Sequence, residues 1–164
     1  MIIVFEGLDK SGKTTLLKAF QRSVNFEHVC IDRGPWSNIF YDMVIHGDHI
    51  DAEERARRMG SFQISALEMS KATDLVVICK SSYDVCVERH NEAGEVMAEH
   101  LYDYDKYKDL FVNVVATNNA MTKMSLVEID TDRLSIVECV EKLIRCIGEL
   151  REARESGLLR FAQT

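Results

Sequence analysis

IIVFEGLDKSGKTT, residues 2 to 15, is the stretch of the sequence that decides the fold. Its first part, Ile2 to Phe5, is a run of apolar, mostly β-branched residues, which is typical of a strand buried on both faces of a parallel sheet. A glycine-rich segment follows at once, and apolar residues from Leu16 to Val24 then recur at helical spacing. The sequence therefore predicts a strand, a loop and a helix in the order that a nucleotide-binding site requires.

The glycine-rich segment has the form G-x-x-x-x-G-K-[ST]. Its glycines let the loop curl so that backbone N–H groups face inward, and the helix that begins at Lys13 adds its positive end. We expect Lys13 to reach the β- and γ-phosphates of ATP and the Thr14 hydroxyl to bind Mg²⁺. The alternative is a glycine turn that only joins strand to helix, and the loop alone does not separate a kinase from a GTPase or a motor. The residues predicted to bind ATP are Gly7, Asp9, Lys10, Ser11, Gly12, Lys13, Thr14 and Thr15.

The rest of the chain alternates strand-like apolar runs with helical stretches. The pattern predicts an α/β protein of the P-loop NTPase type, with a parallel sheet flanked by helices on both faces through right-handed crossovers. We expect one domain over residues 1–164, with a C-terminal tail at about 151–164 that frays. Further strands are expected at 28–31, 75–79 and 126–129, and further helices at 35–46, 51–71 (with an interruption at Gly60 left open), 83–90, 102–118 and 135–154.

Composition and charge bear on partners and location. The chain carries 20 Lys and Arg against 27 Asp and Glu, a formal charge of −7, which disfavours broad adhesion to nucleic acid or to an anionic membrane. Small phosphorylated ligands need only a few convergent cations. No apolar run is long enough to span a membrane, and the five cysteines lie in apolar stretches with no C-x-x-C pair, so we expect a cytoplasmic protein with reduced thiols.

The segment FEGLDKSGKTT resembles the phosphate loop of thymidylate kinases and related deoxynucleoside kinases, which favour F-E-G-x-D-x-x-G-K-[ST]-T. The resemblance implies that Asp9 approaches the sugar of the acceptor. It also implies a catalytic role for Lys10, because one subgroup of the family has an arginine at the matching position, where it aids transfer.

A second match is DRGPWS, residues 32–37, followed by Tyr41, which resembles the family's D-R-[YH]-x-x-S-x-x-x-Y segment. It implies that Asp32 acts near Mg²⁺ or the acceptor hydroxyl and that Arg33 holds the acceptor or the transferred phosphate. The chemistry of the residues agrees, because an Asp at the end of a strand beside the loop can hold a metal and an adjacent Arg can pair with phosphate. A structural Asp–Arg pair, and a place in the core for Trp36 or Tyr41, are the alternatives. The residues predicted to bind the acceptor are Asp9, Arg33, Trp36, Ser37 and Tyr41.

A third, shorter match is VCVER, residues 85–89, which stands where these kinases carry a small mobile lid over ATP. It implies a lid at about 90–101 and a contact between Arg89 and the donor phosphates, with Lys106 or Lys108 as substitutes unless they only form a solvated helix face. The loop after the last strand, residues 128–132, stands where such kinases contact adenine through the backbone.

The family also carries an acceptor-binding insert between the loop and the D-R segment, and only about 18 residues separate Thr14 from Arg33 here. Arg55, Arg58 and Phe62 share one helical face and are candidates to replace this insert. The alternative is an exposed helix whose arginines form salt bridges with nearby glutamates.

These features predict an ATP- and Mg²⁺-dependent phosphotransferase that acts on a nucleotide or nucleoside, with a thymidylate-like acceptor as the first guess. One alternative is a kinase for a larger acceptor, such as a hydroxylated modified base in DNA or a nucleic-acid end. Another is a nucleotide-binding switch or regulatory ATPase, and a homodimer is left open. The predicted catalytic residues are Lys10, Lys13, Asp32, Arg33 and Arg89, and the predicted metal ligands are Thr14 and Asp32.

Overall fold

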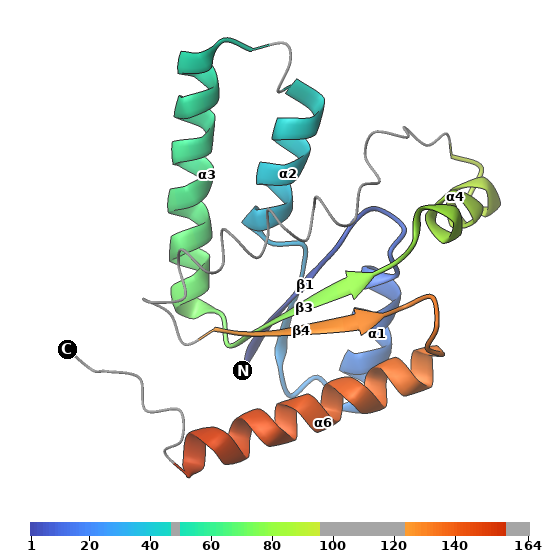
Figure 1. The fold of residues 1–164 in the computed structure, drawn as a ribbon. Coiled ribbons are helices and arrows are strands. Elements are labelled where there is room, and N and C mark those ends of the chain that lie inside the picture. Colours follow the sequence, from blue (N-terminus) through green and yellow to red (C-terminus); the bar gives the residue numbers. More distant parts are fainter. Residues whose placement is uncertain (47–49, 96–123, 157–164) are drawn as a thin grey trace.

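The computed structural model describes residues 1–46, 50–95 and 124–156. Its four strands form one parallel sheet in the order β2-β1-β3-β4 (Figure 1). β1 is central because its apolar run can be buried on both faces. The strands are β1 (Ile2–Glu6), β2 (Val29–Asp32), β3 (Leu75–Lys80) and β4 (Ser125–Asp130).

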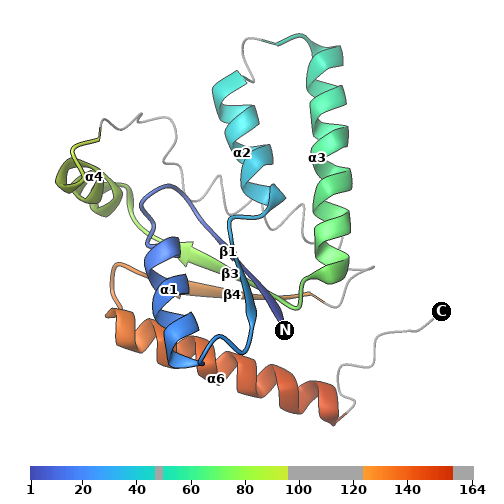
Figure 2. The ribbon, with the colours of Figure 1, turned by 180° about the vertical axis from the view of Figure 1, so that it is seen from behind.

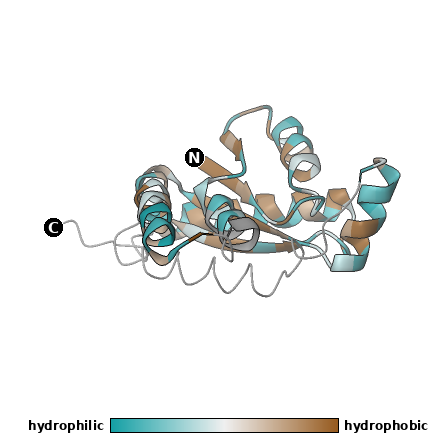
Figure 3. Cartoon of the chain, turned by 90° about the horizontal axis from the view of Figure 1, so that it is seen from above, coloured by the Kyte–Doolittle hydropathy of each residue, from teal (hydrophilic) through white to brown (hydrophobic). Residues whose placement is uncertain are grey.

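Helices cover both faces of the sheet, and Figure 2 shows α1 and α6 on one side and the α2–α3 pair on the other. Alternate strand residues point to opposite faces, so Ile3 and Phe5 pack with α1 and α6, while Val4 packs with α2 and α3. The strands are accordingly mostly hydrophobic in Figure 3, whereas the helices carry mixed surfaces. The helices are α1 (Lys13–Ser23), α2 (Pro35–His46), α3 (Ala52–Ala72), α4 (Tyr83–Glu92) and α6 (Ile136–Glu155).

Local capping explains where two long helices begin. The side chain of Asp51 accepts a hydrogen bond from the backbone N–H of Glu54 at the start of α3, and Ser135 and Glu138 form a reciprocal capping box at the start of α6. Helix α3 continues through Gly60 without the interruption that had been left open. The predicted helix at 102–118, with Lys106 and Lys108, and the second half of the predicted lid, 96–101, lie outside the described residues.

No helix within the described ranges is long and apolar enough to cross a membrane. All five cysteines are unpaired, and three of them (Cys79, Cys86 and Cys139) are buried. Because the strands are parallel, their carboxyl ends meet at one edge of the sheet, where the glycine-rich loop follows β1. In open sheets of this type ligands bind at that edge.

Candidate active site

The glycine-rich loop needs its two glycines for different reasons. Gly7 has φ +144°, and a Cβ there would lie 2.5 Å from the Cys79 carbonyl oxygen, so the loop passes directly against β3. Gly12 has φ +84° and precedes the first residue of α1 without a side-chain cap. The first turn of α1 contains no acidic residue, so its N–H groups and positive end remain available to an anion.

Two polar side chains inside the loop fit a triphosphate. Lys13 is 6% exposed, and its Nζ donates to the Leu8 carbonyl at 2.5 Å. Burial, and then the nearby charge of Arg33, lower the pKa of Lys13. The buried Ser11 hydroxyl has no hydrogen-bond partner among the described residues, which is an unusual state for a buried polar group. A loop with an unsatisfied hydroxyl, a buried lysine and a free helix N-terminus is suited to phosphate oxygens.

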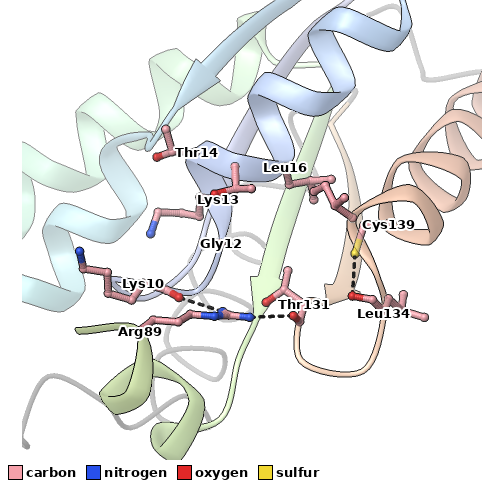
Figure 4. Close-up of a pocket in the computed structure, with 11 residues that line it drawn as sticks. Lys10, Gly12, Lys13, Thr14, Leu16, Arg89, Thr131, Leu134 and Cys139 are labelled. Carbon is pink, nitrogen blue, oxygen red and sulfur yellow. Dashed lines mark hydrogen bonds between the residues drawn. The ribbon is translucent and has the colours of Figure 1, made fainter. Parts of the chain in front are cut away.

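A cavity of about 560 Å³, which we call the first pocket, opens on the α1–α6 side of the loop (Figure 4). One end is polar and is formed by the phosphate loop. The other end is apolar and is formed by Leu16 together with residues of the β4–α6 turn and α6, which suits a nucleobase. Its lining residues are Lys10, Gly12, Lys13, Thr14, Thr15, Leu16, Arg89, Thr131, Leu134, Ile136 and Cys139.

A second pocket, of about 520 Å³, lies on the other side of the same loop. It is lined mainly by charged side chains from the loop, from the end of β2 with the residue after it, and from the segment after α4. It shares three residues, Lys10, Lys13 and Thr14, with the first pocket. The two pockets therefore meet at two lysines and a threonine. The second pocket is lined by Asp9, Lys10, Lys13, Thr14, Asp32, Arg33, His90 and Glu95.

The predicted metal ligands lie side by side. Thr14 Oγ1 donates to Asp32 Oδ2 at 2.5 Å, which joins the start of α1 to the end of β2. No group of three or more His, Cys, Asp or Glu side chains suited to a metal occurs in the described part of the chain. Two hard oxygens still fit Mg²⁺, because this ion is usually held by one or two protein ligands, substrate phosphates and waters.

The loop and the D-R segment are joined by Asp9, Arg33 and Tyr41. Arg33 Nη2 forms an ion pair with Asp9 Oδ1, and its guanidinium lies 4.9 Å from the centroid of the Tyr41 ring. The Asp9 backbone N–H donates to the Tyr41 hydroxyl oxygen at 3.0 Å. Burial, with the nearby Asp9 carboxylate, raises the pKa of Tyr41 to about 12, so this phenol stays protonated near neutral pH.

Trp36 and Ser37 lie deeper than the other residues of the D-R segment. Trp36 is 2% exposed and belongs to the core between the sheet and α3. Ser37 is fully buried and donates to Glu6 Oε2, while the Gly34 N–H donates to Glu6 Oε1 at 2.8 Å. Neither Trp36 nor Ser37 lines the first or the second pocket. For Trp36 this favours the alternative of a core residue.

Arg89 lines the first pocket, and its hydrogen bonds go to the protein. Its guanidinium donates to the carbonyls of Lys10 and Thr131, both at 2.9 Å (Figure 4). It also donates to the Ser81 hydroxyl at 3.2 Å. The Thr131 hydroxyl lies 2.8 Å from the carbonyl oxygen of Ser11. Arg89 and Thr131 therefore fasten the phosphate loop to the β4–α6 turn.

The sequence analysis missed His90 and Glu95, which lie on the far wall of the second pocket. Glu95 accepts a hydrogen bond from Lys10 Nζ at 2.8 Å, and this bond lowers the pKa of Glu95. His90 Nδ1 lies 3.4 Å from the other Glu95 oxygen. No motif marks them as site residues, although both lie within the lid predicted at about 90–101.

Of the face predicted on α3 (Arg55, Arg58 and Phe62), Arg58 forms ion pairs instead of an open anion site. Arg57 and Arg58 both bind Glu54, and these hydrogen bonds lower the pKa of Glu54 to about 2. Arg58 also pairs with Asp42 of α2 at 2.9 Å, and Phe62 packs against the core. The alternative of a salt-bridged helix is the one that the structure favours.

Comparison with known proteins finds similar folds among solved structures. Neither a protein-family model nor a curated protein sequence matches the chain. Solved structures of deoxyadenosine kinase from M. mycoides are similar: the form with bound dATP has 13% identity and a TM-score of 0.61, over 90% of this chain and 100% of that one. The form with bound dCTP has 12% identity and a TM-score of 0.66, with 91% and 100% covered.

YorR protein from Bacillus subtilis, solved in complex with phosphorylated GDP, is also similar. It has 20% identity and a TM-score of 0.59, over 93% of this chain and 98% of that one. At these identities the likeness establishes the fold, which is the predicted parallel P-loop fold.

Proposed function

We propose that the chain is an ATP- and Mg²⁺-dependent kinase that transfers the γ-phosphoryl group to a nucleotide or nucleoside, with a thymidylate-like acceptor as the first candidate. The observation that carries the proposal is the shared wall of the two pockets, Lys10, Lys13 and Thr14. A donor in the first pocket and an acceptor in the second would meet at this wall. Kinases need such an arrangement because catalysis of phosphoryl transfer depends mostly on positioning and electrostatics.

Within this proposal the first pocket holds the donor. The loop N–H groups and Lys13 bind the phosphates and stabilise the charge that develops on the transferred group. Arg89 keeps the loop in place from the β4–α6 turn, to which it is hydrogen-bonded. Thr14 and Asp32 would hold Mg²⁺, whose charge would offset the negative charge of the phosphates.

The second pocket holds the acceptor. Arg33 is placed to bind the acceptor or the arriving phosphoryl group, since its guanidinium is fixed by Asp9 and by the Tyr41 ring. Asp9 is placed to accept a hydrogen bond from an acceptor hydroxyl, and Lys10 lies between donor and acceptor. The bound dATP and dCTP of the deoxyadenosine kinase structures support a nucleotide-type ligand.

A labelled-phosphate assay tests the proposal. The protein is incubated with γ-labelled ATP, Mg²⁺ and, separately, nucleosides, nucleoside monophosphates, single-stranded and duplex DNA, and DNA with hydroxymethylated pyrimidines. We expect label on a nucleoside or a nucleoside monophosphate. Label on DNA alone would favour the larger-acceptor alternative. Label on none of them would overturn the kinase assignment.

Variants separate donor from acceptor roles. Lys13→Ala should abolish transfer with the fold retained, and Arg33→Ala should reduce acceptor use more than ATP binding. Arg57→Ala is the matched control, because Arg57 is an exposed arginine of α3 whose partner is Glu54. Equal loss of ATP binding and acceptor use in Arg33→Ala would contradict the role given to Arg33.

A further inference from the structure

We infer that a separate pocket between α1 and α6, which we call the α1–α6 pocket, binds a small organic monocarboxylate with an apolar body. Its volume is about 380 Å³, in the range of roughly 300–1,000 Å³ that is usual for ligand sites. It shares no lining residue with the first or the second pocket. Both helices line the first pocket near their N-termini and this pocket nearer their C-termini, so the inference does not depend on the proposed kinase activity.

The interior of the α1–α6 pocket suits an apolar ligand body. Phe20 and Ile147 line it and are almost fully buried, and Ile144 lines it with 43% of its surface exposed. A Cβ added at Gly148 would meet no atom within 4 Å. The missing side chain at Gly148 therefore leaves open space beside these apolar residues.

The polar edge of the pocket carries the guanidinium of Arg151, which forms no ion pair with a carboxylate of the described residues. The contact that the structure gives Arg151, among the described residues, is with His28 Nε2 at 3.3 Å from Arg151 Nη2. Arginine only donates, so this nitrogen of His28 accepts and the imidazole is neutral. Burial, followed by the charges of the N-terminus and Arg151, lowers the pKa of His28, which agrees with a neutral ring. His28 also stacks on Phe20, with ring centroids 5.9 Å apart.

This geometry selects the charge of the ligand. A carboxylate is the planar partner that a guanidinium binds through two parallel hydrogen bonds. Glu27 lines the same pocket, and its negative charge disfavours a dianion such as a phosphate monoester more than a monoanion. A monocarboxylate could be a simple aromatic or aliphatic acid or an apolar amino acid, whose ammonium group would have Glu27 nearby.

The inference is tested by titrating the full chain with three compounds that share one phenylpropyl skeleton, with binding measured by NMR or calorimetry. These are 3-phenylpropionate, phenylalanine and the neutral 3-phenylpropanol. We expect at least one carboxylate to bind at least about tenfold more tightly than the alcohol, as is usual for a hydrogen-bonded charge pair. Tighter binding of phenylalanine would identify an amino-acid site, and tighter binding of 3-phenylpropionate would identify a site for simple acids.

Two variants test the residues. Arg151→Gln should weaken carboxylate binding at least about tenfold, and Gly148→Leu should abolish it by filling the pocket. Gly60→Leu is the matched control, since Gly60 is also a helical glycine whose added Cβ meets nothing within 4 Å. The exposed Arg151→Gln change keeps the test valid if Gly148→Leu unfolds the protein. Equal binding of acid and alcohol, unchanged binding in Arg151→Gln, or no binding of either acid would overturn the inference.

Discussion

Replacement of Gly7 by alanine is the substitution for which the structure gives the most definite cost. The residue has φ +144°, and the new Cβ would lie 2.5 Å from the Cys79 carbonyl oxygen and 2.7 Å from the Ser11 hydroxyl. The backbone conformation alone should cost about 1–3 kcal/mol. Displacing the packed β3 backbone should add about 1–3 kcal/mol. Gly7→Ala should therefore lower the free energy of unfolding by about 2–6 kcal/mol, a large part of a typical total of about 5–15 kcal/mol.

Gly12→Ala provides the internal comparison. Gly12 also has positive φ, +84°, but the atoms nearest to its added Cβ belong to the Thr131 side chain and lie at ordinary contact distances of 3.5 Å and more. Gly12→Ala should lower the free energy of unfolding by about 1–2 kcal/mol, the cost of the left-handed backbone conformation alone. Urea denaturation followed by circular dichroism measures both variants against the wild type. If Gly7→Ala were no less stable than Gly12→Ala, the close passage of the loop against β3 would be refuted.

Three further substitutions have expected signs that urea denaturation can check. Gly60→Ala should stabilise the protein by about 0.5–1 kcal/mol, because its Cβ meets nothing within 4 Å, and a lower midpoint would contradict this. Ser135→Ala should cost about 1 kcal/mol by removing the N-cap of α6, and an unchanged midpoint would count against the capping box. Asp74→Asn should lower the free energy of unfolding at pH 7, because the Asp74 carboxylate accepts hydrogen bonds from the Ile2 N–H at 2.8 Å and from Arg154 at 2.6 Å. The expected loss is about 1–2 kcal/mol, which includes a reduction for the partial exposure of this ion pair. Burial opposes the shift, but these two donors lower the pKa of Asp74 below its usual 3.8. The loss of unfolding free energy in Asp74→Asn should therefore be full above about pH 4 and should fade as the pH falls through the lowered pKa. A loss that grew on acidification would refute this.

Much of the fold follows from local sequence signals. The apolar runs placed all four strands to within one residue at each end of the observed bounds, because short apolar runs rich in β-branched residues are typical of strands. In β1 and β3 the runs are also buried on both faces of the sheet. Helix α2 occupies Pro35–His46, the range expected from the sequence, and it begins at Pro35 because proline is tolerated at the first position of a helix. The phosphate loop was equally visible, because glycine spacing, lysine and threonine are all required within eight residues.

The remaining part of the site depends on contacts that no short pattern encodes. Arg89 bonds to carbonyls at positions 10 and 131, and any residue has a carbonyl, so the partners cannot be recognised from their side chains. Glu6 ends an apolar strand and is anchored by donors of the D-R segment about 30 residues away. Trp36 fits a base-stacking and a core role equally well in the sequence, and its burial under α3 depends on the path of that helix.

The dependence of ATP cleavage on an acceptor tests the central claim most directly. The rate at which the γ-phosphate leaves ATP is measured with and without nucleosides and nucleoside monophosphates, in the wild type and in Lys13→Ala. The two pockets joined at Lys10, Lys13 and Thr14 predict that an acceptor raises this rate, that the phosphate appears on the acceptor, and that Lys13→Ala abolishes both. Release of inorganic phosphate at a rate that no acceptor changes would contradict the claim and indicate a nucleotide-binding switch.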